Sequence, residues 1–195
     1  APYYLRAGGV AAVALLALIV VIYSFVPVWH TDVWAHLKFG QWMVGHRALP
    51  AHEPFSPFAD HEAPYIHFQW LSQAGFYLLY HAGESLAGGD AVRRTEGGVE
   101  LLHFTHVLLV LGCCTLLLLA YRRRGGSLPI GCAGVVLLLL LSPSWLMVLR
   151  PQVAGVFFCA ALLLPLSRAT LSRRALVAVP LLLAFIGGVG GRNRA

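Results

Sequence analysis

The chain has 195 residues, of which 58% are hydrophobic and 11% are charged. Soluble domains carry about 25% charged residues, so this composition excludes a soluble globular protein. The formal charge is +6, but the arginines punctuate apolar runs and form no basic surface with interleaved aromatic residues, which excludes a nucleic-acid partner. We therefore predict an all-α integral membrane protein, a multi-span helical bundle whose arginines set its orientation.

Three uncharged runs are long enough to cross a bilayer as helices. A helix needs about 20 apolar residues to span a hydrocarbon core about 30 Å thick. The runs at 9–28, 101–120 and 130–149 meet this length, and a short basic turn joins the second to the third, as in a helical hairpin. The apolar runs at 153–166 and 175–191 are short or interrupted by proline and glycine, and we expect tilted, kinked or incomplete spans there.

The segment 68–80 decides the topology. It is shorter than a span and carries several polar side chains, which is typical of a polar-lined span or of a helix dipping into the interface. If this segment does not cross the membrane, residues 29–65 are extracytoplasmic and the arginines at 122–124 are cytoplasmic. If it does cross, the arginines at 122–124 face the outside. The positive-inside rule favours the first arrangement.

Polar chemistry concentrates in the region that follows the first span. All eight acidic residues fall between positions 32 and 100, and six of the nine histidines fall between 30 and 67. Apolar residues at helical spacing and three tryptophans within 29–44 predict a helix lying on the membrane surface. Asp32 and His36 are four residues apart on that helix, so the imidazole can hydrogen-bond or orient the carboxylate. The alternative is an Asp32 that caps the helix beside an exposed His36.

The histidines also suggest metal or haem binding as hypotheses. No HExxH motif occurs, and the two His-Glu pairs at 52–53 and 61–62 are adjacent residues, which point apart in regular structure. His103 and His106 are three residues apart within an apolar run, where they can ligate a haem or hydrogen-bond across helices. The second interpretation is favoured because no partner motif for a haem accompanies them.

Four short motifs occur in an order that is found in a known enzyme superfamily. They are Asp32-x-x-x-His36-x-x-x-Gly40, Pro50-x-x-x-Pro54-Phe55-Ser56, His67-Phe68-Gln69-Trp70-Leu71 and Arg150-Pro151-Gln152. The ordered set resembles the amino-terminal part of bacterial GT-C-type membrane glycosyltransferases, the superfamily of protein mannosyltransferases and lipid A aminoarabinose transferases. The resemblance covers roughly residues 10–190.

This resemblance implies a multi-spanning enzyme of the bacterial cytoplasmic (inner) membrane. It would transfer a sugar from a polyprenyl-phosphate carrier, a membrane lipid, to an extracytoplasmic acceptor. An acidic residue in the first external loop is essential in that family, and Asp32 matches it as the catalytic residue. The residues expected to bind substrate, from the motifs and from the need for cations near a departing phosphate, are His36, Lys38, His67, Gln69, Arg150 and Gln152. Some relatives use a divalent metal and others do not, so no cofactor is assigned.

Two departures from the family keep a second hypothesis open. Gln69 stands where the family often has a carboxylate, and family members are much longer, so we expect this chain to be the amino-terminal part of a longer protein. The competing hypothesis is a small non-catalytic multi-span subunit that packs against other membrane subunits. A transporter is disfavoured because no charged pair lies at mid-span and no duplicated half is visible.

The predicted organisation has four parts. An amino-terminal tail and first span occupy 1–28, and an extracytoplasmic loop with the surface helix occupies 29–67. A short polar-lined or re-entrant helix and a loop occupy 68–98, and a bundle of about four spans occupies 99–195.

Overall fold

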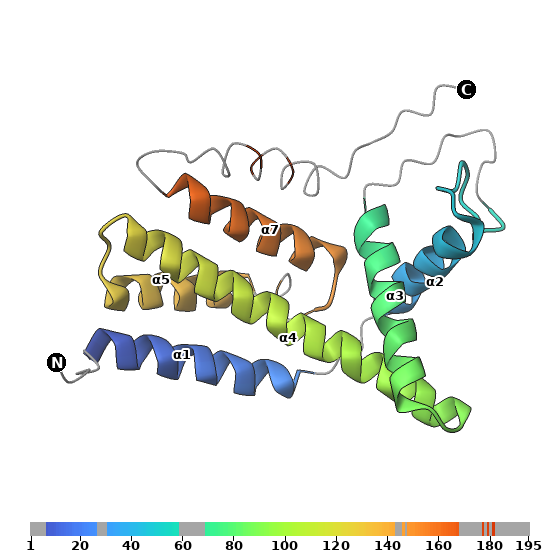
Figure 1. The fold of residues 1–195 in the computed structure, drawn as a ribbon, viewed down its shortest axis with the longest axis horizontal. Helices are drawn as coiled ribbons and strands as arrows, with labels where there is room; N and C mark the ends of the chain where they lie inside the picture. Colours follow the sequence, from blue (N-terminus) through green and yellow to red (C-terminus); the bar gives the residue numbers. More distant parts are fainter. Residues whose placement is uncertain are drawn as a thin grey trace. The chain divides into compact units, whose positions relative to one another are not determined.

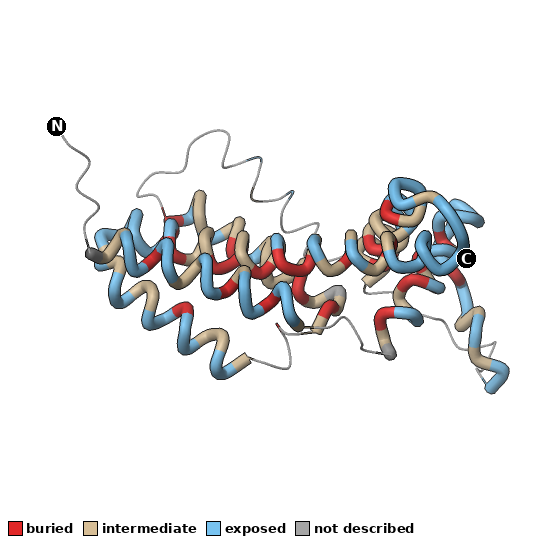
Figure 2. Tube along the Cα trace, turned by 90° about the horizontal axis from the view of Figure 1, so that it is seen from below, coloured by how far each residue is buried: buried red, intermediate tan, exposed pale blue. Residues whose placement is uncertain are grey.

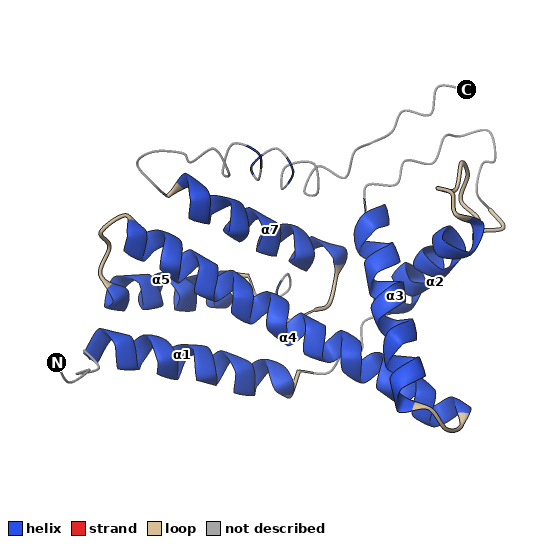
Figure 3. Cartoon of the chain, viewed as in Figure 1, coloured by secondary structure: helices blue, strands red, loops and turns tan. Residues whose placement is uncertain are grey.

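The fold was analysed in a computed structural model of the chain, in which every regular element of the described residues is an α-helix (Figures 1 and 3). The structure describes residues 7–26, 31–58, 69–142, 146, 148–167, 177, 179 and 181. The all-helical part of the sequence prediction is confirmed for these residues.

Two compact units divide the chain. The first consists of residues 1–29 and 103–186, and the second consists of residues 30–102 and 187–195. Helix α4 (Ala91–Arg123) contributes its first part to the second unit and the rest to the first.

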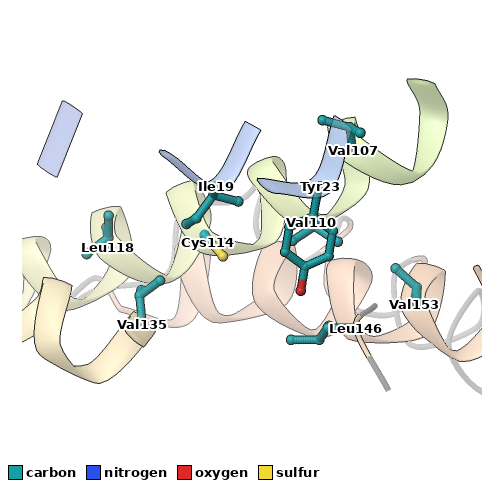
Figure 4. Close-up of a cluster of buried hydrophobic side chains, with 9 residues drawn as sticks. All are labelled: Ile19, Tyr23, Val107, Val110, Cys114, Leu118, Val135, Leu146 and Val153. Carbon is teal, nitrogen blue, oxygen red and sulfur yellow. The ribbon is translucent and has the colours of Figure 1, made fainter. Parts of the chain in front are cut away.

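In the first unit, α4 packs with α1 (Ala7–Ser24), α5 (Leu128–Leu141) and α7 (Pro151–Leu166). Buried positions recur along α4 with exposed positions between them (Figure 2). Figure 4 shows the core that these helices share, with Tyr23 extending from α1 toward Leu146. The core residues are Ile19, Tyr23, Val107, Val110, Cys114, Leu118, Val135, Leu146 and Val153.

One helix of the described residues, α4, is long and apolar enough to cross a membrane. The shorter apolar helices lie within α1, α5 and α7. Helix α7 contains the whole predicted run at 153–166, whereas α1 and α5 match the runs at 9–28 and 130–149 only in part. The predicted run at 175–191 lies almost wholly outside the described residues. The multi-span bundle therefore stays a prediction.

The run at 130–149 is not one continuous helix, which corrects the sequence prediction. Helix α5 ends at Leu141, and Ser142 has left the helical conformation with φ −122° and ψ 37°. The sequence continues with Pro143, and proline disfavours helical geometry in the residue before it while lacking a donor N–H of its own. Apolar composition alone does not reveal this break.

Two arginines of the turn after α4 bind the end of α7. Gly125 adopts φ 82°, a left-handed conformation that glycine accepts without steric cost, and this ends α4. Arg123 Nη1 donates to Leu164 O at 3.3 Å, and Arg124 Nη2 donates to Leu166 O at 2.8 Å. Leu164 O also accepts from Ser167 Oγ at 2.8 Å, and the two cations offset the negative end of the helix dipole.

The second unit contains α2 (Thr31–His46), α3 (Trp70–Ala87) and the start of α4. Helix α3 is longer than the expected segment at 68–80, and α4 begins well before the expected 101. Asp90 explains the early start, because its Oδ1 accepts the backbone N–H of Arg93 at 2.9 Å in a helix cap. A Cβ added at Gly97 would lie 2.8 Å from Gly83 O, so glycines bring α3 and α4 into close contact.

Candidate functional site

Helix α2 carries the residue that sequence analysis predicts to be catalytic. Within the range 29–44, where a helix is predicted, the structure has α2, which begins at Thr31 and extends to His46. Asp32 lies in its first turn, and His36 follows one turn later on the same face, with both side chains half-buried. The amino-terminal turn of a helix favours an ionised carboxylate, because the backbone N–H groups and the dipole present positive charge there.

His36 is held by a residue that sequence analysis did not assign to the site. Gln73 Nε2 lies 3.1 Å from His36 Nδ1, across the contact between α2 and α3. An amide nitrogen only donates, so Nδ1 accepts and the proton of the neutral ring is on Nε2. Gln73 thus fixes both the position and the tautomer of the imidazole.

A glycine allows this contact to form. A Cβ added at Gly40 would lie 2.6 Å from the Cβ of Tyr77 and would collide with the carbonyl group of Gln73. Gly40 is one turn after His36 on the same face of α2. The spacing Asp32-x-x-x-His36-x-x-x-Gly40 therefore combines two polar side chains with the close helix approach that brings His36 to Gln73.

The site contains buried polar atoms that have no partner among the described residues. Gln73 is only 6% exposed, and its Oε1 is buried without a hydrogen bond. Trp70 Nε1, one turn earlier on α3, is buried in the same way. One is an acceptor and the other a donor, so a hydroxyl group, which does both, has the chemistry to satisfy them.

The remaining predicted residues of the second unit are less closely connected. Gln69 is the half-buried residue that precedes α3, and its backbone oxygen accepts from Gln73 N at 3.0 Å. Lys38 is exposed on α2, where Nζ donates to Gln41 Oε1 at 3.1 Å. His67 lies outside the described residues. The four-residue spacing of Gln69 and Gln73 is the one sequence signal that pointed toward the second glutamine.

Arg150 and Gln152 belong to the first unit, at the start of α7. Arg150 immediately precedes α7 and has extended backbone, with φ −131° and ψ 156°. Pro151 is the first residue of α7, a position that suits proline because the N–H it lacks would have no partner within the helix. The buried Gln152 Oε1 makes no hydrogen bond within the described residues.

The two histidines of the apolar run hydrogen-bond across helices, as predicted. His103 Nε2 lies 2.9 Å from Tyr23 O, and His106 Nε2 lies 2.8 Å from Leu146 O. Both acceptors are backbone carbonyls, so each imidazole Nε2 donates, and Tyr23 O also accepts from Val26 N at 3.3 Å. His106 also meets the Tyr23 ring edge to face, with centroids 5.7 Å apart.

In the part of the chain that the structure describes, no three residues among His, Cys, Asp and Glu are grouped to hold a metal ion. The proline-rich segment 49–57 borders a hollow of about 930 Å³ together with Trp42, and its titratable residues are only His52 and Glu53. Glu53 Oε1 accepts from the Phe55 backbone N–H at 3.2 Å, so this acid is engaged in the loop itself.

Comparison of the chain with protein-family models, with curated proteins and with solved structures gives no match.

Proposed function

We propose that this chain is the amino-terminal part of a membrane glycosyltransferase of the GT-C type. The enzyme transfers a sugar from a polyprenyl-phosphate carrier to an extracytoplasmic acceptor. The ordered motifs support the class, and one observation supports the site: a half-buried Asp32 at a helix start, one turn from a histidine whose ring is fixed by Gln73.

The transfer reaction requires a general base and an acceptor hydroxyl held in position. The Asp32 carboxylate takes the proton of the acceptor hydroxyl as its oxygen forms the new bond to the anomeric carbon. The bond from that carbon to the carrier phosphate breaks, and its electron pair leaves with the phosphate.

A departing phosphate needs a cation, and by charge the candidates are Lys38, Arg150 or another arginine. A guanidinium binds two phosphate oxygens in a bidentate fork that an ammonium does not reproduce. Arg150→Lys should therefore weaken binding of a polyprenyl-phosphate analogue to the full-length protein. Equal affinity of the two proteins would remove Arg150 from the site.

Asp32→Asn in the full-length protein tests the function directly. Transfer of labelled sugar from a synthetic polyprenyl-phosphate hexose should fall by about 10² to 10⁴-fold, the usual effect of losing a general base. Asp90→Asn is the matched control, because Asp90 is also an acid at a helix start and caps α4. Normal transfer by Asp32→Asn would return Asp32 to a structural role and favour the hypothesis of a non-catalytic subunit.

A further inference from the structure

A groove of about 450 Å³ lies between α2 and α3, within the second unit. Trp34, Lys38 and Gln41 line it from α2. Tyr77, Tyr80, His81 and Glu84 line it from α3, and Leu37 completes the lining.

This groove is distinct from the side of α2 that bears Asp32. Residues of an α-helix are separated by about 100° around the axis, so Trp34 is about 200° from Asp32 and Lys38 about 240°. Gly40 and Val33, which are buried on the side of α2 that packs on α3, lie between these directions. The groove and Asp32 therefore flank the α2–α3 contact on opposite sides.

Aromatic rings form the apolar part of the groove. Trp34 is 48% exposed and meets Tyr80 edge to face, with centroids 6.2 Å apart. Tyr77 is nearly parallel to His81, with an angle of 7° between the rings. Burial raises the pKa of the Tyr80 phenol, whose hydroxyl also interacts with Thr95, so this ring is anchored from a third helix.

Each wall also carries a polar pair. On α2, Lys38 Nζ donates to Gln41 Oε1 at 3.1 Å, and on α3, His81 Nδ1 lies 3.4 Å from Glu84 Oε2. These contacts orient donors and acceptors along both walls. Lys38 and Glu84 carry opposite formal charges, so the groove has no excess of either sign.

This lining selects among ligand classes. A lipid tail requires a dry apolar wall, which the two charged side chains do not provide, and a phosphate requires an excess of cations. A sugar ring has an apolar C–H face that packs on aromatic rings and a rim of hydroxyls, each both donor and acceptor. A neutral sugar therefore matches the aromatic rings, the paired polar groups and the balanced charge.

We propose that the α2–α3 groove binds a neutral saccharide unit of the acceptor. The sugar that reacts must lie beside Asp32, whereas the groove is on the opposite side of the α2–α3 contact. A sugar bound in the groove is therefore a non-reacting unit. An acceptor that is itself a glycan contains such a unit. The assignment to the acceptor rests on the proposed function, whereas saccharide binding by the groove does not.

Saturation-transfer NMR on the full-length protein in detergent tests saccharide binding, with methyl β-glucoside, methyl α-mannoside and maltose as probes. At least one should bind, and Trp34→Ala should weaken it by about 10-fold, the loss expected for one aromatic contact. Gln41→Leu, which keeps the aromatic wall, should also weaken it. Trp42→Ala is the matched control, because Trp42 is on the same helix and stacks on His46 outside the groove.

Several results would overturn the proposal. They are an absence of binding by all three probes, unchanged affinity in both groove variants, or an equal loss in Trp42→Ala. Tighter binding of glucuronate than of the neutral probes would overturn the choice of ligand class.

The two proposals fail in different ways. Asp32→Asn should keep saccharide binding while losing transfer. If transfer is lost in Asp32→Asn but unaffected by the groove variants, only the proposal that the groove binds the acceptor is contradicted. If saccharide binds and Asp32→Asn transfers normally, only the catalytic assignment of Asp32 is contradicted.

Discussion

Gln73 Nε2 lies 3.1 Å from His36 Nδ1 and joins α3 to the helix that carries Asp32. The two residues are far apart in sequence, and Gln73 is only 6% exposed. The hydrogen bond therefore sets the tautomer of His36 from a position that solvent does not reach. Gln73 is a positioning residue for the proposed base.

Gln73→Leu tests this role. The change removes the Nε2 donor that lies 3.1 Å from His36 Nδ1 and should lower transfer about 10-fold, which corresponds to one hydrogen bond. Gln73→Glu should restore part of the activity, because a carboxylate accepts from the other tautomer of the ring, and it should shift the imidazole ¹⁵N resonances of His36. Gln69→Leu serves as the control, one turn earlier, and a larger loss there than at Gln73 would favour the sequence-based assignment.

Gly40→Ala should destabilise the second unit. The added methyl group would meet the Cβ of Tyr77 at 2.6 Å as well as the backbone of Gln73, so the helices must separate. Overpacking of this kind costs about 1–3 kcal/mol, and the thermal midpoint in detergent should fall accordingly. Gly45→Ala on the same helix meets nothing within 4 Å and should be neutral or slightly stabilising. Equal midpoints for the two variants would contradict the close approach.

Local pattern was enough to predict part of this site. The spacing of apolar residues predicted α2, and the four-residue step placed Asp32 and His36 on one face. The partner of His36 was not predictable in the same way, because Gln73 reaches it through a helix contact made possible by Gly40. A glycine within a helix pattern does not reveal which element approaches it.

Two helix boundaries that the sequence prediction placed wrongly have local causes. Counting apolar residues placed a span at 130–149, although Pro143 lies within the run and α5 ends at Leu141. The same counting delayed the start of α4, because charged residues follow the Asp90 cap before the apolar run begins. Caps and prolines set these boundaries, whereas hydropathy located only the middle of each helix.

His106→Leu should destabilise the first unit. His106 is 1% exposed and donates to Leu146 O at 2.8 Å, so leucine leaves a buried carbonyl without its donor. The cost should be about 1–3 kcal/mol, measured as a lower midpoint of thermal unfolding in detergent. His81→Leu is the control, since the side chain of His81 is 61% exposed and should tolerate the change. A midpoint unchanged in His106→Leu would show that the carbonyl finds another donor.

The last prediction is that the arginine turn after α4 faces the cytoplasm and residues 29–65 face the opposite side. Contacts within the first unit place several helix ends together: Arg124 binds Leu166 O at the end of α7, and a Cβ at Gly8, near the start of α1, would lie 3.3 Å from Pro129 Cδ at the start of α5. The sequence has further arginines at position 6, before α1, and at position 168, after α7.

Such a grouping is what the positive-inside rule favours, and it follows that the chain leaves α1 on the other side. Phe58→Cys and Ser127→Cys, each in a background with the four native cysteines replaced, test this with a membrane-impermeant thiol reagent on intact cells. Phe58 is 95% exposed and should be labelled from outside, whereas the exposed Ser127 position should react only after the membrane is permeabilised. Labelling at position 127 in intact cells, with position 58 protected, would reverse the orientation and place Asp32 on the cytoplasmic side, where an extracytoplasmic acceptor does not reach it.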